Sequence, residues 1–130
     1  MASIFTKIIN GELPAYKIAE NELFIAILDI FPLVKGHTLV IPKVETDKIY
    51  DLDDELFQGL FLFSKKVGIA IEKAFPCKRV GMAVVGLEVP HAHINLIPLN
   101  DFNDIDFRKE KLKLLPEELS EIAESIKNKL

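Results

Sequence analysis

The sequence lacks the features of secreted, membrane and nucleic-acid-binding proteins. It contains one cysteine, Cys77, which cannot form an internal disulfide, and this usage is typical of a reducing compartment. It has no basic run, and 20 acidic residues outnumber 16 basic ones, which argues against affinity for a nucleic-acid backbone. No apolar segment is long enough for a signal peptide or a membrane span. The composition therefore predicts a cytoplasmic protein that binds neither nucleic acid nor membranes.

The 130 residues are expected to form one domain, residues 1–130, which is large enough to bury its own core. Apolar spacing predicts a short helix over residues 3–10, a long helix over 51–75 and a C-terminal helix from Pro116. Extended segments are predicted at residues 16–19, 23–29, 37–41, 80–85 and 90–98. Because most connections are short, we expect an α+β fold with an antiparallel sheet of about five strands, one long central helix and a C-terminal helix.

The long helix over residues 51–75 is apolar around much of its circumference. One face carries residues at helical spacing, and Phe57, Phe61 and Ile69 extend the apolar surface beyond that face. A helix of this kind needs burial on more than one side. A central position within one chain would meet this need, and a homodimer interface would meet it equally well.

Two of the three histidines lie in one segment bounded by prolines, Pro90-His91-Ala92-His93-Ile94-Asn95-Leu96-Ile97-Pro98. We interpret this segment as a strand between two breakers. Because side chains alternate along a strand, His91, His93 and Asn95 are predicted to share one face. The other face would pack into the core through three apolar residues: Ala92, Ile94 and Leu96.

Three kinds of site fit a row of two imidazoles and an amide. A neutral imidazole is a good nucleophile near pH 7, and its attack on phosphorus would split one displacement into two steps. The Asn95 amide could then donate hydrogen bonds to a phosphoryl oxygen. Alternatively, His91 and His93 could both bind zinc, with His37 or Glu88 as a further ligand. Two histidines at this spacing could also be structural, and the residues alone leave these alternatives open.

Four ordered segments make the chain similar to the histidine triad (HIT) family. They are residues 3–15, 28–32, 35–43 and 91–98, the last of which contains His91-Ala92-His93-Ile94-Asn95. The resemblance implies an α+β fold, a homodimer, and a small-molecule nucleotide, with a purine base, that is cleaved at its α-phosphate. It implies no cofactor for the reaction.

The resemblance also implies roles for individual residues. His93 matches the nucleophile that forms a nucleotidyl-enzyme intermediate. His91 matches the first triad histidine, which with Asn95 would hold the non-bridging phosphate oxygens, and His37 matches a histidine close to the triad. Asp29 matches the acid that holds the ribose hydroxyls. Further positions match apolar residues around the base: Ile4, Phe5, Ile8, Leu13, Ile27, Ile30 and Leu39.

The chain departs from the family pattern at three places. The third triad position is Asn95 instead of histidine, and the loop at residues 86–90 is short and lacks residues that many members place near the leaving group. Many members bind structural zinc through Cys-x-x-Cys, whereas this chain has Ser3 and Thr6, with Glu45 in place of a histidine ligand. We therefore expect no metal site, and we expect either a nucleotide hydrolase or a nucleotide-binding module with little turnover.

Overall fold

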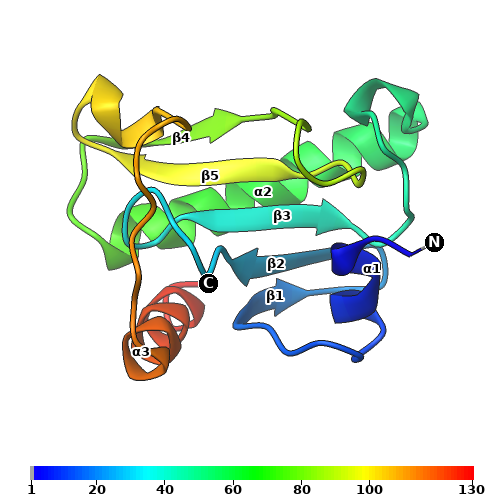
Figure 1. The fold of residues 1–130 in the computed structure, drawn as a ribbon. Helices are drawn as coiled ribbons and strands as arrows, with labels where there is room; N and C mark the ends of the chain where they lie inside the picture. Colours follow the sequence, from blue (N-terminus) through cyan, green and yellow to red (C-terminus); the bar gives the residue numbers. More distant parts are fainter. Residues whose placement is uncertain (1) are drawn as a thin grey trace.

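The computed structural model describes residues 2–130 as a five-stranded antiparallel sheet flanked by helices (Figure 1). The strand order is β1-β2-β3-β5-β4, and every neighbouring pair is antiparallel. The elements are α1 (Ile4–Ile9), β1 (Lys17–Glu20), β2 (Phe24–Leu28), β3 (Thr38–Pro42), the 3₁₀ turn η1 (Ile49–Asp51), α2 (Asp54–Ala74), β4 (Arg79–Ala83), β5 (Ile94–Leu99), the 3₁₀ turn η2 (Phe102–Ile105) and α3 (Pro116–Lys127). The predicted α+β class is confirmed.

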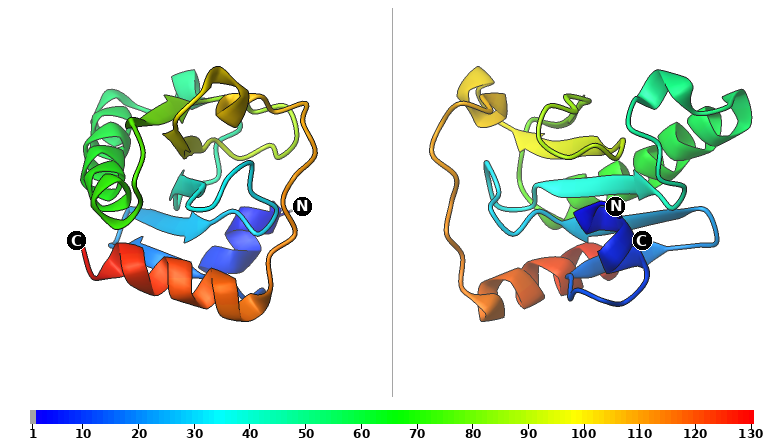
Figure 2. Two further views of the ribbon diagram at one scale, coloured as in Figure 1. Left: turned by 90° about the vertical axis from the view of Figure 1, so that its left-hand side faces the viewer. Right: turned by 45° about the vertical axis from the view of Figure 1, so that its right-hand side comes forward.

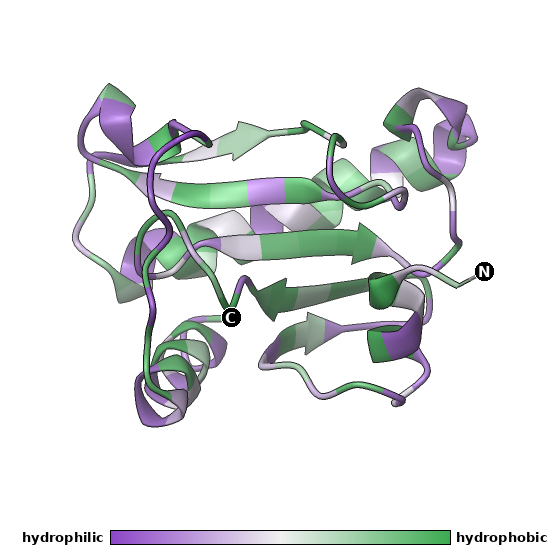
Figure 3. Ribbon diagram, in the orientation of Figure 1, coloured by the Kyte–Doolittle hydropathy of each residue, from purple (hydrophilic) through white to green (hydrophobic). Residues whose placement is uncertain are grey.

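The long helix α2 covers one face of the sheet (Figures 1 and 2). Asp53 caps it by accepting a hydrogen bond from the backbone N–H of Leu56 at 2.8 Å, so the helix begins three residues later than the predicted residue 51. The helix and the mostly hydrophobic central strands (Figure 3) form the larger core. No helix within residues 2–130 is long and apolar enough to cross a membrane.

The opposite face of the sheet carries a smaller apolar cluster, in which Phe5 of α1 packs on β2 and β3 residues such as Ile27 and Leu39. The segment that joins η2 to α3, residues 106–115, passes along the same side (Figure 2, left). We call this segment the strap. Its Leu112 N–H donates to Pro32 O at 2.9 Å, which ties it to the loop before β3. Helix α1 and the strap therefore flank this face of the sheet.

The strand predicted over residues 90–98 is shorter than expected, because β5 begins at Ile94. The β3–β5 ladder ends at the Val40–Ile94 pair. Beyond it, Pro42 has no N–H to donate, and the N–H of Ala92 donates to Thr46 O at 2.7 Å. His91 and His93 therefore lie in an irregular segment before the strand. As predicted, Ala92, Ile94 and Leu96 are buried in the core.

Candidate active site

A cavity of about 550 Å³ opens on the face between α1 and the strap. Four of the predicted polar residues line it: Asp29, His37, His93 and Asn95. Six of the predicted apolar residues also line it: Ile4, Phe5, Ile8, Ile27, Ile30 and Leu39. Leu13 does not, and its neighbours Pro14 and Ala15 take that place, since Leu13 lies exposed in the turn after α1.

The ring of His93 is fixed with one nitrogen free. Its Nδ1 lies 2.9 Å from the backbone oxygen of His91, and because a carbonyl only accepts, Nδ1 carries the proton and donates. The lone pair is then on Nε2. Phe5 holds the ring in an edge contact with 4.9 Å between centroids. Burial lowers the pKa of His93 below its ordinary value of 6.5, so the imidazole is neutral at pH 7.

His37 and Asn95 form a buried hydrogen-bonded pair. The backbone N–H of Leu33 donates to His37 Nδ1 at 3.1 Å, so the proton is on Nε2, which donates to Asn95 Oδ1 at 2.9 Å. The Asn95 amide nitrogen donates to Ala83 O at 3.2 Å. Burial lowers the pKa of His37, against the opposing effect of Asp29, and the Nδ1 contact agrees with a neutral ring. Asn95 therefore has one amide hydrogen left for a ligand.

Asp29 lies at the end of β2, beside this pair. Its Oδ1 accepts from the N–H of Phe31 at 2.9 Å, and its Oδ2 lies 3.8 Å from His37 Nε2. One carboxylate oxygen is thus committed to the turn that places the side chain at the cavity. The other oxygen is an acceptor suited to hydroxyl groups of a ligand.

His91 does not line the cavity, so the expectation that it contacts the phosphate is corrected. The residue is fully buried, and both ring nitrogens have partners within the protein. Nε2 donates to Pro42 O at 2.8 Å, and Nδ1 accepts from the hydroxyl of Ser3 at 2.7 Å. His91 lies away from the cavity because it precedes the strand, so its side chain does not follow the alternation of faces along the strand.

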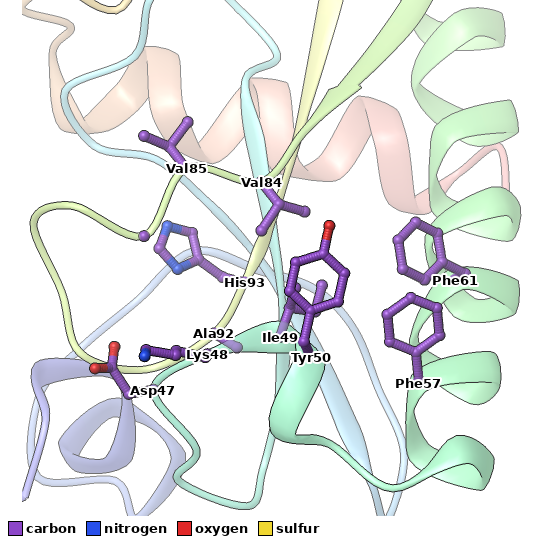
Figure 4. Close-up of a pocket in the computed structure, with 11 residues that line it drawn as sticks. Asp47, Lys48, Ile49, Tyr50, Phe57, Phe61, Val84, Val85, Ala92 and His93 are labelled. Atoms are coloured by element: carbon purple, nitrogen blue, oxygen red, sulfur yellow. The ribbon is translucent and has the colours of Figure 1, made fainter.

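A second hollow lies on the other side of His93, toward α2 (Figure 4). Figure 4 shows Tyr50 placed between Val84 and two phenylalanines of α2, Phe57 and Phe61. Tyr50 is 88% exposed, which is unusual for a large aromatic residue in an apolar setting. His93 thus lies between two hollows, each of which is lined by both apolar and polar side chains.

Comparison with known proteins decides the family. Residues 10–102 match the profile of the HIT domain. The chain belongs to the HIT family. This confirms the resemblance carried by the four sequence segments.

The similarity to individual HIT proteins covers nearly the whole chain. An uncharacterized HIT-like protein of Borreliella burgdorferi is 36% identical over 95% of this chain and 94% of its own length. The adenosine 5′-monophosphoramidase hnt1 of Schizosaccharomyces pombe is 34% identical over 100% of this chain and 99% of its own length. A Zn-bound histidine triad family protein from Mycobacterium smegmatis has the same fold, with a TM-score of 0.83 and 27% identity. The match covers 99% of this chain and 93% of that protein's chain.

Sequence reasoning missed the part of the cavity wall that the strap forms, which consists of Phe107, Arg108 and Lys111. Phe107 makes an edge contact with His37 at 6.3 Å between centroids, and Lys111 Nζ donates to Phe107 O at 2.7 Å. The strap lies beyond residue 102, where the HIT domain match ends. The one available signal was an aromatic residue beside two cations in an otherwise polar segment.

Proposed function

We propose that this HIT protein is a nucleotide phosphoramidase or nucleotidyl hydrolase in which His93 attacks the α-phosphorus. The observation that carries the proposal is the orientation of His93, whose Nδ1 is bound to His91 O while Nε2 keeps its lone pair at the cavity. The similarity to a protein named adenosine 5′-monophosphoramidase supports the same chemistry. The single cysteine favours the reducing cytoplasm as the place of action.

The proposed reaction has two steps, transfer of the nucleotidyl group to His93 and its hydrolysis by water. In the first step a bond forms between His93 Nε2 and the α-phosphorus. The bond from phosphorus to the amide nitrogen of a phosphoramidate, or to the bridging oxygen of a dinucleoside polyphosphate, breaks, and the leaving group takes a proton from water. In the second step water attacks phosphorus, the bond to His93 breaks, and a nucleoside monophosphate leaves. The negative charge of the phosphate oxygens would be met by the remaining amide hydrogen of Asn95.

The rest of the cavity suits a nucleoside. The apolar side chains on α1, β2 and β3 would hold a purine base, and Asp29 would accept hydrogen bonds from the ribose hydroxyls. Phe107 on the strap would close the site beside His37. Glu88 lines the mouth of the cavity as an exposed side chain, which suits a solvated acid near the leaving group.

A nucleotide-binding module with little turnover is the second candidate, and one observation favours it. The Asn95 side chain already bonds to His37 and to Ala83 O, so it has less to offer a phosphate than a free amide would. An amide also cannot supply a proton or a positive charge. Both candidates predict nucleotide binding, and they differ only in turnover.

Release of nucleoside monophosphate separates the two candidates. The wild type is incubated with an adenosine 5′-phosphoramidate and, separately, with a dinucleoside polyphosphate, and binding of adenosine monophosphate is measured by calorimetry. An enzyme releases monophosphate well above the rate of a His93→Gly variant. Binding with equal, slow release from both proteins would show a binding module instead.

The pH dependence of kcat/KM follows from the lowered pKa of His93. Only the unprotonated ring can attack, so kcat/KM should be constant from pH 8 to about 6.5 and fall below that, with a midpoint under the unperturbed value. The measurement uses a dinucleoside polyphosphate across pH 5–8. A midpoint above pH 7 would contradict the assignment of His93 as a buried neutral nucleophile.

We further propose that the protein is a homodimer that pairs through α2 and the free edge of β4. β4 is an edge strand with Met82 45% exposed, and Leu62 of α2 is 68% exposed. The hollow at Tyr50, which Phe57 and Phe61 of α2 also line, lies beside His93. An unpaired strand edge next to apolar side chains is suited to a two-fold interface.

The Leu62→Glu variant should dissociate this dimer. A charge placed in an apolar interface is expected to weaken association at least about tenfold. Sedimentation over a concentration series checks this, with Leu115→Glu as the matched control, since Leu115 is similarly exposed, at 62%, but lies just before α3. A wild type that sediments as a monomer at every concentration would overturn the proposal.

The residues near the N-terminus are not suitable ligands for the structural zinc that some HIT proteins bind. Structural zinc takes Cys and His ligands, whereas this chain offers the hydroxyls of Ser3 and Thr6 and the carboxylate of Glu45. Both nitrogens of His91 already have partners. In the described residues no group of three His, Cys, Asp or Glu side chains is placed to hold a metal ion. We assign no step of the reaction to a metal.

A further inference from the structure

Four polar side chains converge between the start of α1, the loop after β3 and the histidine segment. The Ser3 hydroxyl lies 2.7 Å from His91 Nδ1 and 3.3 Å from the Thr6 hydroxyl. The Thr6 hydroxyl donates to Glu45 Oε1 at 2.6 Å, and the same oxygen accepts from the backbone N–H of Ser3 at 2.7 Å. We call these four residues the Ser3 cluster. It joins segments that are 42 and 88 residues apart in the chain.

The hydrogen bonds of the Ser3 cluster fix the direction of each proton. Since Pro42 O only accepts, His91 Nε2 carries a proton and donates to it, and Nδ1 in this tautomer is an acceptor. The one hydrogen of the Ser3 hydroxyl can point to Nδ1 at 2.7 Å or to the Thr6 hydroxyl at 3.3 Å, and the shorter contact is the one to Nδ1. The same Ser3 oxygen accepts from the N–H of Thr6 at 3.0 Å, as the N-cap of α1. Among residues 2–130 no buried side-chain nitrogen or oxygen is left without a partner. The cluster has no spare acceptor or donor on His91.

The backbone carbonyl of His91 connects the Ser3 cluster to the proposed nucleophile, His93. The carbonyl of His91 accepts the Nδ1 proton of His93, and that contact alone selects the tautomer with the lone pair on Nε2. His91 N–H donates to Val89 O at 2.8 Å and the next N–H, of Ala92, donates to Thr46 O. These bonds are made outside the sheet ladder. The Ser3–His91 hydrogen bond joins this segment to the start of α1, beside the edge contacts of Phe5 with the rings of His91 and His93.

We propose that Ser3, Thr6 and Glu45 are positioning residues for His93, acting through the buried ring of His91. The inference rests on the proposed role of His93 as nucleophile. The hydrogen-bonded cluster does here what a metal site could do elsewhere: it locks the N-terminal helix to the histidine segment. Loss of the Ser3 hydroxyl leaves Nδ1 of His91 with only the Thr6 hydroxyl, which lies 3.5 Å away and already donates to Glu45. This would let the segment shift and loosen the contact to His93.

Kinetics of three variants test the proposal. Ser3→Ala should lower kcat about tenfold, with KM changed less than about twofold, because the cluster orients the nucleophile and does not touch the nucleotide. Ser3→Thr keeps the hydroxyl and should restore most of kcat. Ser120→Ala, on the exposed face of α3, is the matched control and should behave as the wild type. Equal kcat in Ser3→Ala and the wild type would overturn the proposal.

The ring nitrogen shifts of His93 give a second measurement that needs no turnover. In ¹⁵N-labelled wild type, Nδ1 should show the protonated signal and Nε2 the unprotonated one, and Ser3→Ala should mix the two tautomers. If Ser3→Ala does not fold, Glu45→Ala and Glu45→Gln replace it: Glu45 is exposed, and only glutamine keeps the acceptor oxygen. A single unchanged His93 tautomer in Glu45→Ala would overturn the proposal. An inactive wild type that shows the shift would instead count against the proposed function.

Discussion

The His93→Gly variant is expected to release nucleoside monophosphate at least about 10³-fold more slowly than the wild type. Among residues 2–130, His93 Nε2 is the one imidazole nitrogen with no hydrogen-bond partner, since both nitrogens of His37 and both nitrogens of His91 are bound. Removing it leaves hydrogen bonds that bind the substrate but no atom to attack phosphorus. Initial rates with a phosphoramidate substrate measure the loss.

Chemical rescue separates the loss of a nucleophile from the loss of structure. Glycine at position 93 vacates space beside Phe5, which contacts the ring in the wild type, and added imidazole could enter there. We expect imidazole to raise the rate of His93→Gly and to leave the wild type unchanged, while nucleotide affinity stays within about threefold of wild type. Residual activity within tenfold of the wild type, without imidazole, would contradict the role of His93.

The Asn95→Leu variant is expected to have the second largest effect, in this case on stability. Leucine has nearly the shape of asparagine but removes the hydrogen-bond partner of the buried His37 Nε2–H and of the part-buried Ala83 O. Two unpaired polar groups should lower the free energy of unfolding by about 2–4 kcal/mol. Chemical denaturation measures the change, with the exposed Asn103→Leu as control. A loss below about 0.5 kcal/mol would show that the buried pair is unimportant for stability.

The Asn95→His variant tests what the natural amide does for turnover. Histidine at this position restores the usual triad residue and can add a proton or a charge near the phosphate. A large gain in rate would mean that Asn95 limits catalysis in the natural protein. An unchanged rate would mean that the remaining amide hydrogen is sufficient, and it would favour the enzyme over the binding module.

The sequence was sufficient to predict the fold class and most of the cavity. Short turns between extended segments predicted the antiparallel sheet, and apolar spacing predicted a long helix over residues 51–75, where α2 spans Asp54–Ala74. The ordered segments predicted that Asp29, His37 and His93 lie around one site, and all three line the cavity. These features depend on local pattern and motif spacing, which a sequence carries directly.

The parts that the sequence did not predict depend on contacts between distant segments. His91 was expected to face the phosphate because a strand alternates, but the strand begins only at Ile94. The partners that bury His91 are Ser3 and Pro42, which are 88 and 49 residues away. Phe107 reaches the cavity by the path of the strap, and an aromatic residue beside two cations does not by itself predict that path. Long-range hydrogen bonds and loop paths have no periodic signature.

Detection of a covalent intermediate on His93 tests the central claim most directly. The wild type is mixed with excess adenosine 5′-phosphoramidate, quenched in base within milliseconds to seconds, and analysed by intact mass and peptide fragmentation. We predict a protein mass raised by one adenylyl group, located on His93, stable in base and lost in acid, as expected of a phosphorus–nitrogen bond. Steady release of monophosphate with no such species, or with the adenylyl group on another residue, would contradict the account.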